Sequence, residues 1–182
     1  MKRIIPIVLG LLAVTGGAFA QSDADTINRA LAAAPAQQKE AATVIKWKAD
    51  NTYDTLKKGT NHLVCYDRSG ENGHAPFAVQ CTSMGNLERV AQNRHFEAMP
   101  DKAARQAALD AAEANGTRVK PEYGSVWYMM NGPDQATARP HTTVALPGAT
   151  TQSTGLPDNP KQGGAWIMNA GTSTAHLMTP GH

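Results

Sequence analysis

The sequence lacks an excess of charge of either sign. Of its 17 lysines and arginines, Lys2 and Arg3 lie in an N-terminal leader, so basic and acidic residues balance at 15 each in the rest of the chain. Nucleic-acid affinity depends mainly on phosphate neutralisation, and anionic membranes attract clustered lysine and arginine. Because the chain after the leader carries no net charge and has no basic run, we expect no nucleic-acid partner.

Sequence motifs of catalytic sites are missing as well. There is no G-x-S-x-G nucleophile elbow, and Gly124-Ser125-Val126 lacks its second glycine. No two histidines have the H-x-x-x-H spacing, and Gly163-Gly164 is a lone pair of glycines without a phosphate-binding pattern. We therefore favour a protein that is not an enzyme, with an uncharacterised hydrolase as an alternative.

Long hydrophobic runs are absent beyond the first twenty residues. Lys2 and Arg3 precede an apolar run over 4–14, and Ala18-Phe19-Ala20 then forms an A-x-A cleavage site. This run is too short for a stable membrane anchor, and Gln21 in place of cysteine argues against lipidation. We expect residues 1–20 to be a signal peptide and 21–182 to form one globular domain, periplasmic or secreted, without a transmembrane anchor.

Cysteine is scarce, with only Cys65 and Cys81 in the chain. The absence of Cys-x-x-Cys spacing disfavours a redox pair or a zinc site. Two cysteines in an oxidising compartment predict a structural disulfide. A loop of this size stabilises the fold by about 3 kcal/mol in the chain-entropy description.

The apolar pattern alternates between helical and strand periods. Helices are predicted over 27–34, where Pro35 ends the pattern, and in an inserted segment over 84–114. In the first half of that segment Leu87 and Val90 form the apolar stripe, while Arg89 and its polar neighbours lie mostly off it. The second half is rich in alanine and has little to bury.

Short β-branched or apolar runs bounded by turn residues predict the strands. They span 43–48, 52–56, 62–66, 77–81, 123–130, 141–146, 165–168 and 175–178. The first three have short connections and predict an antiparallel meander. The fold class is therefore α+β, with a mostly antiparallel sheet and an inserted helical segment. Residues 149–164, rich in Thr, Gly, Pro and Ser, predict a long surface loop that Leu156 alone can pin to the body.

Histidines are candidate metal ligands. His141 and His176 fall in late predicted strands, and His95 falls on a helix that can cover the sheet. Convergence of these three would make a zinc or copper site. We favour the alternative of separate histidines, exposed or hydrogen-bonded at strand ends, because no ligand spacing supports the site. The methionines fall mostly in apolar strands, where core packing is expected.

Aromatic residues make up only 5% of the chain, so their placement is informative. Trp127, Tyr128 and Trp166 all fall in predicted strands and are candidates for a small apolar ligand. The function we expect is small-ligand binding or interaction with an envelope protein, with histidine-based zinc or copper binding as an alternative. The sequence points to no particular cofactor.

Several short motifs resemble a group of exported bacterial proteins without an assigned activity. The motifs are Lys58-Gly59-Thr60-Asn61 before the strand with Cys65, V-W-Y-M-M-N-G at 126–132 and the terminal His176-Leu177-Met178. Ala175 stands where that group tends to have proline, and Asn131 interrupts its glycine pair. The resemblance implies a fold and an export route, and no chemistry.

The leader generates the first prediction. Export of the full-length chain should give a mature protein that begins at Gln21, because signal peptidase cleaves after the A-x-A motif. Intact-mass analysis of the exported protein measures this directly. Recovery of the uncut precursor outside the cytoplasm would contradict it.

Overall fold

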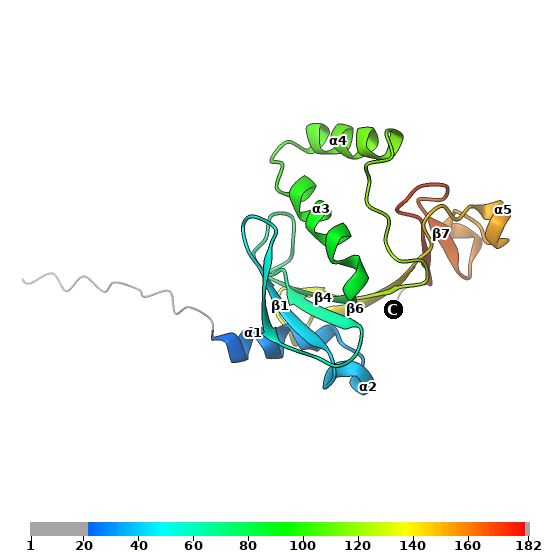
Figure 1. The fold of residues 1–182 in the computed structure, drawn as a ribbon. Helices are drawn as coiled ribbons and strands as arrows, with labels where there is room; N and C mark the ends of the chain where they lie inside the picture. The colour runs from blue at the N-terminus through cyan, green and yellow to red at the C-terminus, as the bar shows by residue number, and fades with distance from the viewer. Residues whose placement is uncertain (1–21, 181–182) are drawn as a thin grey trace, which may run out of the picture.

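The computed structural model describes residues 22–180, so the expected signal peptide lies outside the described part of the chain. There, helices cover both faces of a β-sheet (Figure 1). The helices are α1 (Asp23–Ala30), α2 (Ala36–Lys39), α3 (Leu87–Glu97), α4 (Lys102–Ala114) and α5 (Thr151–Thr154), with 3-10 turns at Leu31–Ala33, Met84–Asn86 and Pro160–Gln162.

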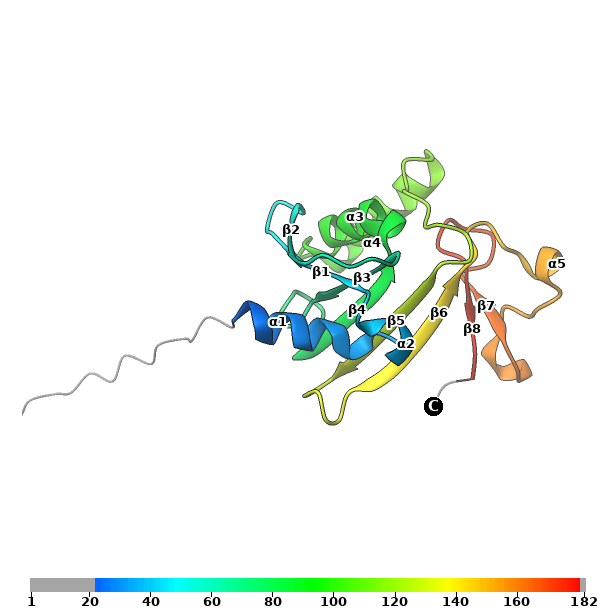
Figure 2. The same cartoon turned by 60° about the horizontal axis from the view of Figure 1, so that its bottom comes forward.

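Eight strands form the sheet of the described residues. They are β1 (Thr43–Trp47), β2 (Tyr53–Lys57), β3 (Leu63–Asp67), β4 (Phe77–Ser83), β5 (Val126–Gly132), β6 (Arg139–Ala145), β7 (Trp166–Met168) and β8 (His176–Met178). Their order is β2-β1-β3-β4-β5-β6-β8-β7, and β8 and β7 extend the sheet beyond β6 (Figure 2). The structure thus confirms an α+β fold with a mostly antiparallel sheet and a helical insertion between β4 and β5.

The predicted meander of the first three strands is wrong. β1 pairs with β2 in the antiparallel sense but with β3 in parallel, so β2 lies at the edge of the sheet. Val44 and Ile45 of β1 are fully buried, whereas the first three residues of β2 are exposed. The more apolar strand therefore takes the inner position, and the polar strand takes the edge.

Helix α1 covers one face of the sheet. The Ser22 hydroxyl accepts a hydrogen bond from the Asp25 backbone N–H at 3.1 Å and caps the helix. Ala30 and Leu31 pack into a core that includes the disulfide of Cys65 and Cys81. The two cysteines lie directly opposite each other on β3 and β4, with their Cα atoms 4.0 Å apart. The disulfide therefore joins two neighbouring inner strands beneath α1.

Helix α3 covers the other face. Leu87 and Val90 pack on Ile45, Val64 and Tyr66 of the sheet, as the apolar stripe predicts. The alanine-rich α4 rests against α3 at its far end from the sheet (Figure 1) and buries only Ala112 of its own residues, as expected from its composition.

The predicted loop over 149–164 contains two short helical elements. The Thr150 hydroxyl accepts from the Ser153 N–H at 3.0 Å, and the Ser153 hydroxyl meets the Thr150 backbone N–H, which makes the capping box that starts α5. Leu156 packs against a small core that includes Ala149 and Ile167. Sequence reasoning missed these elements because each is only three or four residues long.

No helix of residues 22–180 is both long and apolar enough to cross a bilayer. This agrees with the absence of a second hydrophobic run in the sequence.

The disulfide generates a prediction on stability. Replacing both cysteines, Cys65→Ala with Cys81→Ala, should lower the free energy of unfolding by about 3 kcal/mol, because the unfolded chain loses its loop constraint. Urea unfolding of the oxidised parent and the double variant measures the difference. Two titratable thiols in the unreduced, denatured parent would contradict the disulfide itself.

Candidate functional site

A cavity of about 220 Å³ lies between α3 and the sheet. Its floor consists of alternate residues of β5 and β6, which share one face of the sheet. Trp127 is paired with Thr143, and Met129 is paired with His141. The floor continues across Ala145 to His176 of β8.

The wall of the cavity comes from α3 and two connecting segments. Arg89 and Asn93 are four residues apart on α3, so they project from the same side of the helix. Pro121 belongs to the linker between α4 and β5, and Thr174 and Ala175 precede β8. Segments distant in sequence thus enclose one hollow.

Arg89 is the most buried charged residue of this wall, with 3% of its surface exposed. Its Nη1 donates to the Val119 carbonyl oxygen of the linker and to the Ser173 hydroxyl at 3.4 Å. Burial, and after it the positive charge of Arg118, lower the pKa of Arg89 to about 10, although the nearby Glu113 opposes this change. The guanidinium is therefore still cationic at neutral pH.

A second buried arginine ties the linker to α3. Arg118 is 8% exposed, and its guanidinium donates to the side-chain oxygens of Gln92 and Asn93. Gln92 also accepts from the Val119 backbone N–H at 3.0 Å and donates to the Thr117 carbonyl at 2.9 Å. Three polar side chains of α3, those of Arg89, Gln92 and Asn93, thus hold residues 117–119 of the linker, which leads to Pro121 in the cavity wall.

The acidic group next to this cluster, Glu113, contacts Ser173 and makes no direct contact with either arginine. Glu113 accepts from both the backbone N–H and the hydroxyl of Ser173, and these hydrogen bonds lower the pKa of Glu113. Within the described residues no carboxylate oxygen lies within 4 Å of Arg89 or Arg118. No Asp or Glu lines the cavity in the same part of the chain, so its charge is positive.

Another hollow, beside β1 and the other side of α3, has balanced charges. Arg68, also 3% exposed, makes ion pairs with Glu71 at 2.7 Å and with Glu97. Burial lowers the pKa of Arg68, but the two carboxylates outweigh this effect and raise it. Arg94 also pairs with Glu71, so this network joins the segment after β3 to α3, and both of its arginines have carboxylate partners.

His176 is held in one orientation at the cavity. Its Nδ1 lies 2.7 Å from the Thr174 carbonyl oxygen. Because a carbonyl only accepts, Nδ1 carries the proton and donates.

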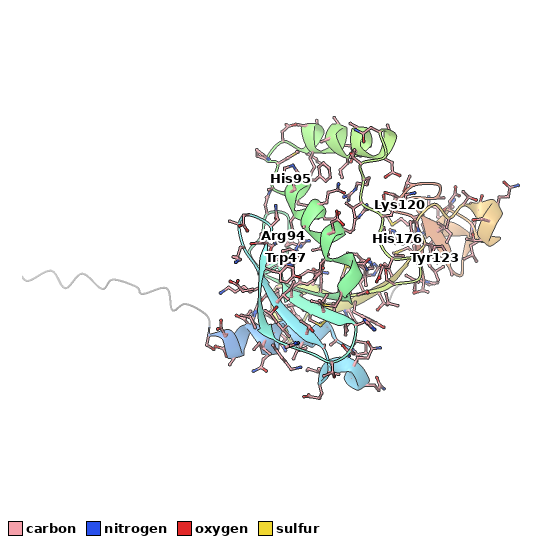
Figure 3. All side chains as sticks on the ribbon, viewed as in Figure 1. Trp47, Arg94, His95, Lys120, Tyr123 and His176 are labelled. Carbon is pink, nitrogen blue, oxygen red and sulfur yellow. A yellow bond between two sulfur atoms is a disulfide. The ribbon has the colours of Figure 1, made fainter. Side chains whose placement is uncertain are left out.

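The three histidines proposed as metal ligands do not converge. His141 and His176 both line the cavity, but His176 pairs with Ala145, four residues from His141 along β6, or about 13 Å. His95 is exposed near the end of α3 that meets α4, away from His176 (Figure 3). Among residues 22–180 no three His, Cys, Asp or Glu side chains lie close enough together to hold a metal ion.

The three aromatic candidates also lie at separate places on the sheet and do not form one site. Trp127 lines the cavity. Tyr128, its neighbour in the strand, points to the opposite face and packs against the core beneath α1. Trp166 pairs with Met178 at the edge of the sheet, with β6 and β8 between it and Trp127.

Sequence reasoning missed Arg89, which carries the charge of the site. The sequence pattern places Arg89 off the apolar stripe of its helix, whereas in the structure the linker covers that side and buries Arg89. A signal was present, because Arg89, Gln92 and Asn93 have the i, i+3, i+4 spacing of a continuous polar stripe.

Neither a protein-family model, nor a curated protein, nor a solved structure matches the chain at a significant level. The resemblance to exported bacterial proteins therefore stays a prediction.

The linker clamp generates a prediction. Gln92→Ala should lower the free energy of unfolding by about 1–3 kcal/mol, because Val119 N–H and Arg118 lose their acceptor. Gln106→Ala is the matched control on α4, where an exposed glutamine donates only to Asp110, and it should cost less than about 0.5 kcal/mol. Urea unfolding measures both, and equal losses would contradict the clamp.

Proposed function

We propose that this protein binds a small organic molecule in the cavity between α3 and the β5–β6 floor. The observation that carries the proposal is the lining itself. An apolar floor of Trp127 and Met129 faces a few fixed polar groups, which is the usual composition of a ligand site. Its volume of about 220 Å³ lies below the range of roughly 300–1,000 Å³ typical of drug-sized ligands, so a small molecule fits.

Binding is better supported than catalysis. Within the described residues the hydroxyl groups that line the cavity belong to Thr143 and Thr174, and no cysteine or serine joins them. Ser173 lies behind Arg89, and its hydroxyl donates to Glu113. His176 has no hydroxyl or thiol partner that it would activate as a base. No specific observation therefore favours the hydrolase alternative.

The compartment is part of the proposal. The A-x-A leader and the buried Cys65–Cys81 disulfide both support an oxidising environment, periplasmic or outside the cell. A small-molecule binder released there would meet solutes that enter the envelope or the medium.

Filling the cavity tests the proposal. Ligand-observed saturation-transfer NMR with benzoate, benzamide and benzyl alcohol should give signals for at least one of them with the parent protein. Met129→Trp should abolish these signals, because a larger side chain on the floor occupies the space.

Met168→Trp is the matched control, because Met168 is 45% exposed on β7 and does not line the cavity. It should leave the signals unchanged. Fragment signals that survive Met129→Trp, or no signal with any fragment, would contradict the proposed function.

A further inference from the structure

The cavity wall contains a buried cation that, within residues 22–180, has no carboxylate in direct contact. Arg68 and Arg89 are equally buried, at 3% exposure each. Arg68 contacts two carboxylates, whereas within the described chain Arg89 contacts the neutral oxygens of Val119 and Ser173 through its Nη1. The nearest acidic group, Glu113, reaches Arg89 only through the Ser173 hydroxyl. Removal of a cation from water is costly unless it is paired, so buried charges normally have a counter-charge.

The unused atoms of Arg89 are its Nε and Nη2. Neither atom makes a hydrogen bond within residues 22–180. Both keep some accessible surface, because neither is a fully buried polar atom without a partner. Because Arg89 lines the cavity and these two nitrogens are not fully enclosed, we infer that a ligand in the cavity reaches this edge of the guanidinium. The two N–H groups of such an edge match the two oxygens of a carboxylate.

Thr143 supplies a second, independent observation. Thr143 is only 7% exposed, and it lines the cavity. Its hydroxyl makes no hydrogen bond within the described chain. Its side chain lies beside Trp127, its pair on β5. One buried donor-acceptor group and one buried cation thus face the same space.

We infer that the ligand of the cavity is a small organic carboxylate, bound through its oxygens to the Nε–Nη2 edge of Arg89, with its apolar part over Trp127 and near the Thr143 hydroxyl. This inference rests on the proposed function and assigns a chemical class to its ligand. Arg89 bonds Ser173, so it stands at the end of the cavity where β8 begins. Thr143 lies two residues from Ala145 along β6, which is about 7 Å, and it is paired with Trp127 of β5. The rest of the ligand would lie over this pair.

The positive charge of the cavity selects against other ligand classes. Arg118 stands behind Arg89 and adds to the field, and the two arginines are close enough for the charge of Arg118 to act on Arg89. A cationic ligand would meet this field without any lining carboxylate. A neutral amide of the same shape would leave Arg89 without its counter-charge.

Probes of one shape and different charge test the inference at neutral pH. Benzoate, benzamide, benzylamine and phenyl phosphate are titrated into the parent protein, and dissociation constants are taken from ligand-observed NMR. Benzoate should bind at least about 10-fold more tightly than benzamide, because a charge-assisted pair with Arg89 replaces a neutral contact. Benzylamine should not bind.

Arg89→Met should weaken benzoate binding by about 10- to 100-fold and leave benzamide binding unchanged. Arg118→Met is the matched control, because Arg118 is similarly buried and helps to hold the linker, but does not line the cavity. It should weaken benzoate binding by less than about threefold, the effect of a charge at longer range.

A further variant keeps the test decisive if Arg89→Met does not fold. Thr143→Val preserves side-chain shape and removes only the hydroxyl, so it should weaken benzoate binding by about three- to tenfold. In the parent protein, the ¹⁵Nε signal of Arg89 should shift with benzoate and not with benzamide.

The outcomes separate the two proposals. Absence of binding by every probe overturns the proposed function, and this inference with it. Binding of benzamide or benzylamine as tight as that of benzoate, when Met129→Trp abolishes it, leaves the proposed function standing and overturns the carboxylate class. Tighter binding of phenyl phosphate than of benzoate also overturns the carboxylate class.

Discussion

The structure around the cavity depends on the burial of one guanidinium. Arg89 projects from the polar side of α3 and bonds the linker at Val119 and the segment before β8 at Ser173. A single side chain therefore holds together three parts of the chain that are far apart in sequence. Gln92 and Arg118 extend the same clamp along the helix. These contacts use only Nη1 of the guanidinium. In our proposal the N–H groups of Nε and Nη2 bind the ligand in the cavity.

Much of the fold could be predicted from local patterns. Alternating apolar residues located the strands, and alanine and capping residues located the inserted helices. Two cysteines behind an expected signal peptide indicated the disulfide. The pairing order of the first strands could not be predicted, because it depends on which strand buries both faces. Val44 and Ile45 make β1 an inner strand, and β2 therefore moves to the edge. Strand order is a tertiary property that short connections alone do not determine.

The candidate site was less accessible from the sequence. Trp127, His141 and His176 were selected for their chemistry, and all three line the cavity. The pairing register of β5, β6 and β8 places them at different positions along the strands, so they do not meet. His95 and Trp166 share that chemistry and lie elsewhere. Arg89 went unnoticed because its burial depends on a linker thirty residues away. Helical periodicity shows which residues share a side of one helix, but not which other segment covers that side. Residue type identifies candidates, whereas topology decides which of them meet.

The central claim is that the free edge of Arg89 receives an anion in this cavity. A crystal structure of the mature chain soaked with 4-bromobenzoate tests it most directly, because the anomalous signal of bromine locates the ring independently of the protein. The account predicts both carboxylate oxygens within hydrogen-bond distance, about 2.7–2.9 Å, of Arg89 Nε and Nη2, with the bromine on the Trp127 side. A bromine peak outside the cavity, or a carboxylate directed away from Arg89, would contradict it.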